Sequence, residues 1–293
     1  MGKVQLLLSF LVLTVFSPVS LFAQERFDLV KRDGHYYFTA PIRDVPVEMM
    51  VESGIPAMLV GKEIFASCLE SSGLAFRPAA QKIRLLNHVY NIVCKSEGMI
   101  GIGNSVYDGP VFVLEDYEGV AIPVQYLKDP VSQRSVLTID LKDNYLLVGK
   151  REGRIDGTRY KLSSDRTLGF PVVAASVDLA TPGGIAKLKG GLIVDFGNPS
   201  LLFLLKQHKS LAKAIRRKKI ELKDAFDGQG RLVAQGVYAD SVSLLGRKYY
   251  DLSIGVTDRM QSIEQLGFLG IPFFESPVVF DFDNGVMILS DSK

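Results

Sequence analysis

The chain contains one sequence pattern twice, and this duplication constrains its folding more than any other feature. The segment VESGIPAML at 51–59 and the segment VDFGNPSLL at 194–202 share a valine, an acid, a glycine, a proline and two apolar residues in the same order. Glu52 and Asp195 occupy the matching acidic positions, 143 residues apart. Internal similarity of this kind indicates two copies of one structural unit.

A second pair of matching segments supports the duplication. SVLTIDLKDNYLLV at 135–148 and SPVVFDFDNGVMIL at 276–289 place Asp140 and Asp281 141 residues apart. Each segment has an apolar run, a polar stretch and another apolar run, which predicts a β-hairpin, and Asn284-Gly285 is a favoured two-residue turn. Two matches at nearly the same spacing predict two homologous lobes.

The rest of the sequence predicts a mainly β chain. We expect one lobe over 24–150 and another over 151–293, because the stretch at 149–165 is polar, charged and poor in apolar periodicity. Most other apolar runs are rich in β-branched and aromatic residues and are bounded by Gly, Asp or Pro, which is typical of strands. Two helices are predicted, a short one in KEIFASCLESSG at 62–73 and a longer one over 199–220.

The first 23 residues have the features of a secretory signal peptide. Lys3 precedes the apolar run LLLSFLVLTVF, and a stretch of small and polar residues ends at Ala23, which predicts cleavage before Gln24. The alternative is an uncleaved N-terminal anchor. No later apolar run approaches the ~18 residues of a membrane-spanning helix. We therefore expect a secreted or periplasmic protein without a membrane span.

Charge, cysteine and histidine content give little indication of further ligands or partners. The net charge of +2 gives no indication of nucleic-acid binding. Export favours a disulfide between Cys68 and Cys94, the alternative being two buried free thiols. The three histidines lack the spacing of metal ligands, so no metal site is expected. The basic run RRKKIELK at 216–223 fits a solvated helix end, the alternative being a face for an anionic partner or membrane surface.

Two acids in equivalent turns form a candidate catalytic pair. An acid at the junction of a strand and a turn is held firmly, and pseudo-symmetry would bring Glu52 and Asp195 together between the lobes. Two carboxyls about 3 Å apart share a proton, because both cannot ionise easily. One can then act as a base on water while the other, protonated, polarises a carbonyl.

Three segments give the chain its resemblance to the pepsin and retropepsin family of aspartic peptidases. VEMMVESGIPAML at 47–59 and GLIVDFGNPS at 191–200 resemble the two active-site turns of that family. LGFLGIPFFESPVVFDFDNGVMIL at 266–289 resembles its closing segment, with Phe268-Leu269-Gly270 as the apolar-apolar-Gly element. The resemblance spans most of residues 27 to 291.

The resemblance implies an acid-protease fold with two pseudo-symmetric β-barrel-like lobes and a few short helices. It implies hydrolysis of a peptide or protein substrate by a single chain, without a cofactor, in the cleft between the lobes. Glu52 and Asp195 would be the catalytic acids. The residues expected to contact the substrate are Ser53, Gly54, Phe196 and Gly197.

The sequence departs from the family in both turns. Glu52 replaces an aspartate, and its extra methylene moves the carboxyl by roughly 1–1.5 Å. Phe196 lacks the hydroxyl that orients the pair in the family, whereas Ser53 retains one. The first half shows no apolar-apolar-Gly element, and Thr138 stands near its expected place. The departures leave two alternatives to a peptidase, namely an inactive relative that binds extended peptides as an added strand and a surface β-protein without a cleft function.

A flap over the cleft is expected from the hairpin around NHVYNIVCKSEGMIGIG at 87–103. The family often places a tyrosine there, and Tyr90 and Tyr107 are the candidates.

Overall fold

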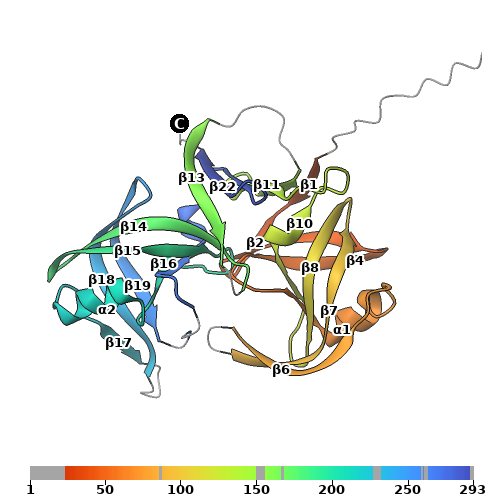
Figure 1. Ribbon diagram of the computed structural model, residues 1–293, viewed down its shortest axis with the longest axis horizontal. Helices are drawn as coiled ribbons and strands as arrows, with labels where there is room; N and C mark the ends of the chain where they lie inside the picture. The colour runs from red at the N-terminus through yellow and green to blue at the C-terminus, as the bar shows by residue number, and fades with distance from the viewer. Residues whose placement is uncertain are drawn as a thin grey trace, which may run out of the picture.

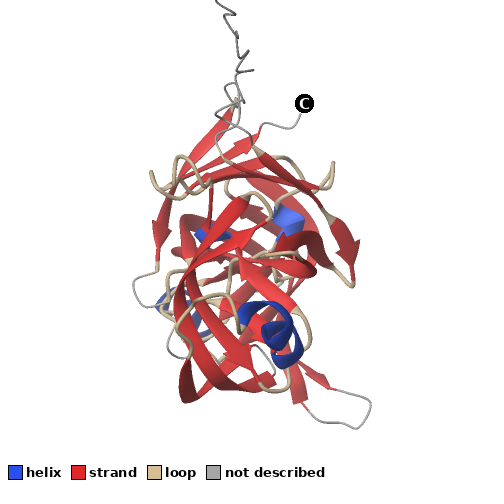
Figure 2. Cartoon of the chain, turned by 90° about the vertical axis from the view of Figure 1, so that its right-hand side faces the viewer, coloured by secondary structure: helices blue, strands red, loops and turns tan. Residues whose placement is uncertain are grey.

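The computed structural model describes residues 24–85, 88–149, 156–165, 168–226, 232–258, 260 and 263–290. Its architecture is mainly β, as predicted, with strands dominating every view and only short helices (Figure 2). The predicted signal peptide lies outside the described residues, as does the segment 150–155, so the division of the chain into lobes at residue 150 stays a prediction.

The strands before residue 150 are β1 (Glu25–Asp28), β2 (Val30–Arg32), β3 (His35–Ile42), β4 (Val45–Glu52), β5 (Met58–Gly61), β6 (Arg77–Leu85), β7 (His88–Ile102), β8 (Ser105–Leu114), β9 (Val120–Pro123), β10 (Leu127–Lys128), β11 (Val136–Asp140) and β12 (Tyr145–Val148). Those after it are β13 (Gly157–Ser164), β14 (Pro171–Thr181), β15 (Gly184–Val194), β16 (Leu202–Leu205), β17 (Lys223–Phe226), β18 (Leu232–Leu244), β19 (Arg247–Thr257), β20 (Gly267–Leu269), β21 (Val278–Asp281) and β22 (Val286–Ser290). The helices are α1 (Lys62–Ile64), which continues as a π turn over Phe65–Leu69, and α2 (Lys209–Arg216), with 3₁₀ turns at Val124–Tyr126 and Ile271–Phe273.

The two halves share one pattern of strand pairing. In the first half β4 runs parallel to β9, β9 antiparallel to β5, and β5 parallel to β8. In the second half β15, β20, β16 and β19 pair in the same order with the same directions. The additional pairings β7–β8 and β14–β18 curl each sheet toward closure, which gives the two barrel-like groups of strands in Figure 1.

A sheet built from both halves joins the two groups. The predicted hairpins are present as β11–β12 and β21–β22, and β11 pairs with β21 so that Thr138 lies opposite Val279. β1 extends this sheet beside β12, and β13 extends it beside β22 before continuing into the second group (Figure 1). The two repeats therefore meet edge to edge, which removes two exposed strand edges.

The hairpin turns differ from the sequence prediction. Because Asp281 pairs with Val286, the turn comprises four residues instead of the two-residue Asn284-Gly285 turn. The carboxylate of Asp281 accepts a hydrogen bond from the Asn284 N–H at 3.0 Å. The Asp140 carboxylate does the same for two backbone N–H groups of its own turn. A side-chain cap of this kind stabilises a longer turn.

The prediction of the longer helix, over 199–220, is wrong in its first part. The run at 199–220 forms strand β16 and then α2, which begins after His208, whose side chain accepts a hydrogen bond from the Ser210 N–H at 3.3 Å. The apolar residues of β16 are paired on both sides, with β19 and β20, and periodicity alone does not separate such a run from a buried helix. The basic residues 216–219 that follow are exposed.

The two cysteines are free thiols, so the disulfide considered from the sequence is not formed. Cys68 is buried in the turn after α1, where its thiol donates to the Ile64 carbonyl at 3.0 Å. Cys94 lies on β7, and its cross-strand neighbours are Pro78 and Val113. The two residues are thus placed on separate elements, each packed against other partners.

The hydrophobic core runs through both halves and the shared sheet as one large cluster. Two smaller clusters lie apart from it, one around Ile55 and Leu59 in the first half and one around Phe170 and Phe268 in the second. Fully burying an apolar side chain of this size contributes about 1.5–3 kcal/mol. The smaller clusters matter for function, because they form the two walls of the cleft described below.

Candidate active site

The two acids stand at the equivalent, buried ends of two strands. Glu52 is the last residue of β4, and Asp195 follows the last residue of β15. Both strands are held by a parallel neighbour: Val51 lies opposite Ile122 of β9, and Val194 lies opposite Leu269 of β20. The paired strands therefore position both carboxyls between the two groups of strands.

Each carboxyl packs over the glycine of the opposite turn. A Cβ atom on Gly54 would lie 2.6 Å from the Cγ of Asp195, and a Cβ on Gly197 would overlap the Glu52 carboxyl. The Glu52 carboxyl thus lies over the far turn in the same way as the Asp195 carboxyl, although the Glu52 side chain is one methylene longer. Both turns need glycine because no larger residue leaves room for the facing acid.

Hydrogen bonding and burial make the two carboxyls unequal. Burial, the charge of Asp195 and a hydrogen bond to Asp195 raise the pKa of Glu52 well above its ordinary value. Burial also raises the pKa of Asp195, to about 6, although the Gly197 N–H donates to its carboxylate at 3.0 Å and stabilises the charged form. The shared proton therefore resides on Glu52, which is 8% exposed, while Asp195 is the acid that ionises first.

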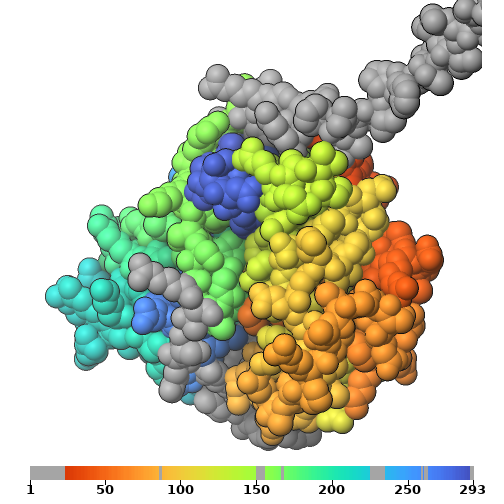
Figure 3. Space-filling model, turned by 45° about the vertical axis from the view of Figure 1, so that its right-hand side comes forward, coloured from red at the N-terminus to blue at the C-terminus, as the bar shows by residue number. Residues whose placement is uncertain are grey.

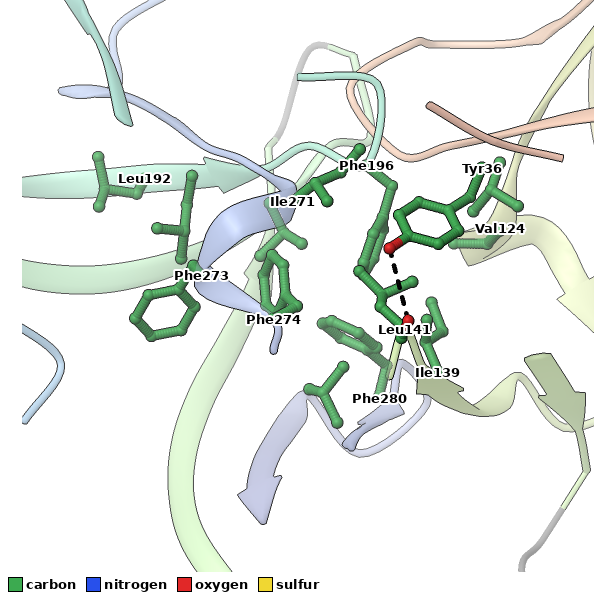
Figure 4. Packing of buried hydrophobic residues seen from close by; sticks show 14 of the residues in the cluster. Tyr36, Val124, Ile139, Leu141, Leu192, Phe196, Ile271, Phe273, Phe274 and Phe280 are labelled. Atoms are coloured by element: carbon green, nitrogen blue, oxygen red, sulfur yellow. Dashed lines mark hydrogen bonds between the residues drawn. The ribbon is translucent and has the colours of Figure 1, made fainter. Parts of the chain in front are cut away.

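A single hydroxyl ties the two turns together. The Ser53 hydroxyl donates to the Val194 carbonyl at 2.7 Å and accepts from the Phe196 N–H at 3.1 Å. The second turn offers no equivalent bond, because Phe196 points into the core, where its ring packs against Phe274 at 4.9 Å and Phe280 at 5.7 Å between centroids (Figure 4). Aromatic packing thus replaces one of two hydrogen-bonded links.

Replacing Ser53 with alanine should loosen this link measurably. The variant leaves the buried Phe196 N–H and Val194 carbonyl without their partner, and each unsatisfied group costs about 1–3 kcal/mol. We expect the free energy of unfolding, measured by denaturant titration, to fall by roughly 2–6 kcal/mol. The control is Ser96→Ala, whose hydroxyl makes an exposed bond to the Ala75 carbonyl. Equal effects of the two changes would contradict the role of Ser53.

The pair lies in a cleft of about 660 Å³ between the two halves. One wall comes from residues of the first half and the other from residues of the second, and the two halves lie side by side as the yellow-orange and green-teal regions of Figure 3. The floor and walls are mostly apolar. The apolar residues that line the cleft are Met50, Ile55, Pro56, Leu59, Ile83, Leu85, Ala121, Leu168, Phe170, Phe203, Met260, Ile263 and Phe268.

Of the four residues predicted to contact the substrate, two line the cleft and two do not. Gly54 and Gly197 line the cleft together with the two acids. Ser53 and Phe196 do not, and this part of the prediction is corrected: both are buried, Ser53 by its link between the turns and Phe196, 1% exposed, by the aromatic core.

The expected flap corresponds to the hairpin β6–β7, whose strands carry several cleft-lining residues. Tyr90 is one of them, and its ring contacts that of Tyr117 at 5.5 Å. Tyr107 is excluded, because it is fully buried and its hydroxyl accepts from the Met58 N–H at 2.9 Å and donates to the Pro110 carbonyl.

Two features of the site were missed in the sequence. The first-half counterpart of the apolar-apolar-Gly element is β9, which ends in Pro123, and the expectation near Thr138 was wrong because that residue lies in the shared sheet. Tyr117 lines the cleft, and burial and the charge of Glu52 raise the pKa of its phenol. The role of β9 was missed because Pro123 stands where a glycine was expected. No sequence motif indicated that Tyr117 lines the cleft.

The same arrangement of strands occurs in a solved enzyme. The structure is similar to an aspartic proteinase from Irpex lacteus, with a TM-score of 0.56 over 92% of this chain and 98% of that chain. The fold is that of the aspartic proteinases. The predicted pepsin-like fold class is therefore confirmed, while the sequence identity of 12% limits the likeness to the fold. No protein-family model and no curated protein matches the chain.

The rest of the described structure adds two findings about this aspartic-proteinase fold. Within the ranges that the structure describes, no three or more His, Cys, Asp or Glu side chains come together as a metal site. Over the same ranges, no helix has the length and apolar character needed to cross a membrane.

Proposed function

We propose that the chain is an exported peptidase in which Glu52 and Asp195 activate water to cleave a peptide bond. The observation that carries the proposal is the pair itself, in which each carboxyl lies over the glycine of the opposite turn and both carboxyls have a raised pKa. The sequence of residues 1–23 supports export, and the single-chain site is consistent with a monomer.

The unequal environments assign the roles. Asp195, the acid that ionises first, takes a proton from water, whose oxygen attacks the carbonyl carbon of the substrate. Glu52 gives its proton to the carbonyl oxygen, so that a neutral tetrahedral intermediate forms. Asp195 then returns its proton to the amide nitrogen while Glu52 takes a proton from a hydroxyl of the intermediate, so that the C–N bond breaks, a carboxylic acid and an amine form, and both acids regain their starting states. No cofactor is required for any of these steps.

A second candidate function is peptide binding without hydrolysis. Two observations favour it: Glu52 is longer than the usual acid, and Phe196 removes one of the two links that orient the pair. Displacements near 1 Å in a catalytic site can lower the rate about a hundredfold. A chain of this kind would hold an extended segment in the cleft as an added β-strand.

The test uses purified chain lacking residues 1–23 and an unfolded protein mixture. We expect cleavage products, detected by mass spectrometry, to accumulate at acidic pH, where Glu52 keeps its proton and Asp195 begins to ionise. Absence of cleavage between pH 3 and 7, together with measurable peptide binding, would refute the peptidase and support the binding module. Neither cleavage nor binding would refute both and leave a surface protein without a cleft function.

A further inference from the structure

Apart from Glu52 and Asp195, the side chains in the cleft that can carry charge at neutral or acidic pH are all basic. These side chains are His35, Lys82 and Arg84. Among the residues that the structure describes, none of the three forms an ion pair with an acid. Such a cleft attracts a negatively charged group.

Asn198, which lines the same cleft, has an unused hydrogen-bond donor. Its side chain is 7% exposed, and its Oδ1 accepts from the Ser200 N–H at 3.0 Å, which fixes the orientation of the amide. Its backbone is held by bonds to Asp195 and Ile271. Within the described part of the chain its Nδ2 has no partner. A buried donor without a partner is costly, and a ligand that accepts its hydrogen bond recovers that cost.

His35 supplies a second such atom from the other half of the chain. It begins β3 directly after Gly34, and a Cβ on Gly34 would lie 3.1 Å from the Cβ of Pro199, the neighbour of Asn198. The Nδ1 atom of His35 is buried and lacks a partner among the described residues. His35 and Asn198 therefore adjoin two residues that approach each other across the boundary between the halves, and both line the cleft.

We propose that His35 and Asn198 form a subsite for the carboxylate of an acidic substrate side chain. A carboxylate only accepts hydrogen bonds, the Asn198 amide donates one through Nδ2, and an imidazole with a proton on Nδ1 donates from that atom. Lys82 and Arg84 on β6 add attraction over a longer range. The inference rests on the proposed function of the cleft and specifies its substrate class: peptides with apolar residues at the reacting centre and one Asp or Glu that faces His35 and Asn198.

The test measures selectivity by binding, so that it does not depend on catalysis. Short fluorescent peptides with an apolar centre carry Glu at one flanking position, and matched peptides carry Gln there, with every flanking position sampled. Binding to the Asp195→Asn chain is followed by fluorescence anisotropy at pH 5. We expect one position at which Glu binds roughly 10–100-fold more tightly than Gln, since charge-assisted hydrogen bonds are about twice as strong as neutral ones.

Variants of the two residues identify the subsite. Asn198→Asp keeps the oxygen that accepts from Ser200 but removes the donor, and it should reverse the preference in favour of Gln. His35→Gln should reduce the Glu preference at the same position to about threefold or less. The matched control is Asn284→Ala in the exposed β21–β22 turn, which should leave the preference unchanged.

The outcomes separate this inference from the peptidase proposal. Cleavage by the wild-type chain with equal binding of Glu and Gln peptides would overturn the subsite and leave the peptidase standing. A Glu preference that depends on Asn198, without cleavage by the wild-type chain, would support the subsite in a binding module. No binding of any peptide would overturn the subsite, as would a Glu preference unaffected by Asn198→Asp.

Discussion

Replacing Asp195 with asparagine is expected to reduce peptide cleavage by roughly 10²–10⁴-fold, the range for loss of a general base. Asparagine has nearly the same shape, so the turn should remain in place, with the Gly197 N–H still donating to an oxygen. It cannot take a proton from water. The measurement is kcat/KM for a single peptide substrate across pH 3–7, with circular dichroism to show that the variant is folded.

Two further variants make this result specific to the pair. Glu52→Gln should cause a loss of similar order, because the group that protonates the carbonyl oxygen is removed. Asp240→Asn, at an exposed position on β18, is the matched control and should retain wild-type activity. Activity retained by Asp195→Asn, or lost equally in the Asp240 variant, would contradict the assignment of the catalytic acids.

The paired acids should also make the fold less stable as the pH rises. The pKa of Asp195 increases from its ordinary value of 3.8 to about 6 in the folded chain, and that of Glu52 is raised further by its partner. The folded state thus holds protons that the unfolded state releases, so stability is greatest below about pH 4 and is lost as the pH rises past 6. For Asp195 this loss amounts to about 3 kcal/mol.

The double variant Glu52→Gln/Asp195→Asn removes both titrating groups. We expect it to exceed the wild-type chain in free energy of unfolding by at least about 3 kcal/mol at pH 8, because Glu52 adds to the contribution of Asp195, and the difference should shrink toward zero near pH 4. Urea titrations at intervals of one pH unit measure this difference, with Asp240→Asn as the control. A difference independent of pH, or one that grows as the pH falls, would show that the two carboxyls are not held in protonated form.

The internal repeat made much of the fold predictable. Matching Glu52 with Asp195 and Asp140 with Asp281 led to paired strands and paired hairpins, because strand, turn and strand are local patterns with a period that the sequence displays. The same local reasoning failed at β16, where four apolar residues suit a buried strand as well as a helix. It failed again at β9, where Pro123 stands in place of the glycine that marks β20.

The sequence by itself determined that the chain is mainly β, that it is duplicated and that two acids occupy equivalent turns, since these properties follow from residue order. Only the tertiary structure decided how those acids differ. Burial, the Gly197 N–H and the charge of the partner set their proton affinities, and all three depend on residues far apart in the chain. The same holds for Ser53, which links two turns 143 residues apart, and for the unpartnered donor of Asn198, because hydrogen bonds and desolvation arise from contacts that residue order does not contain.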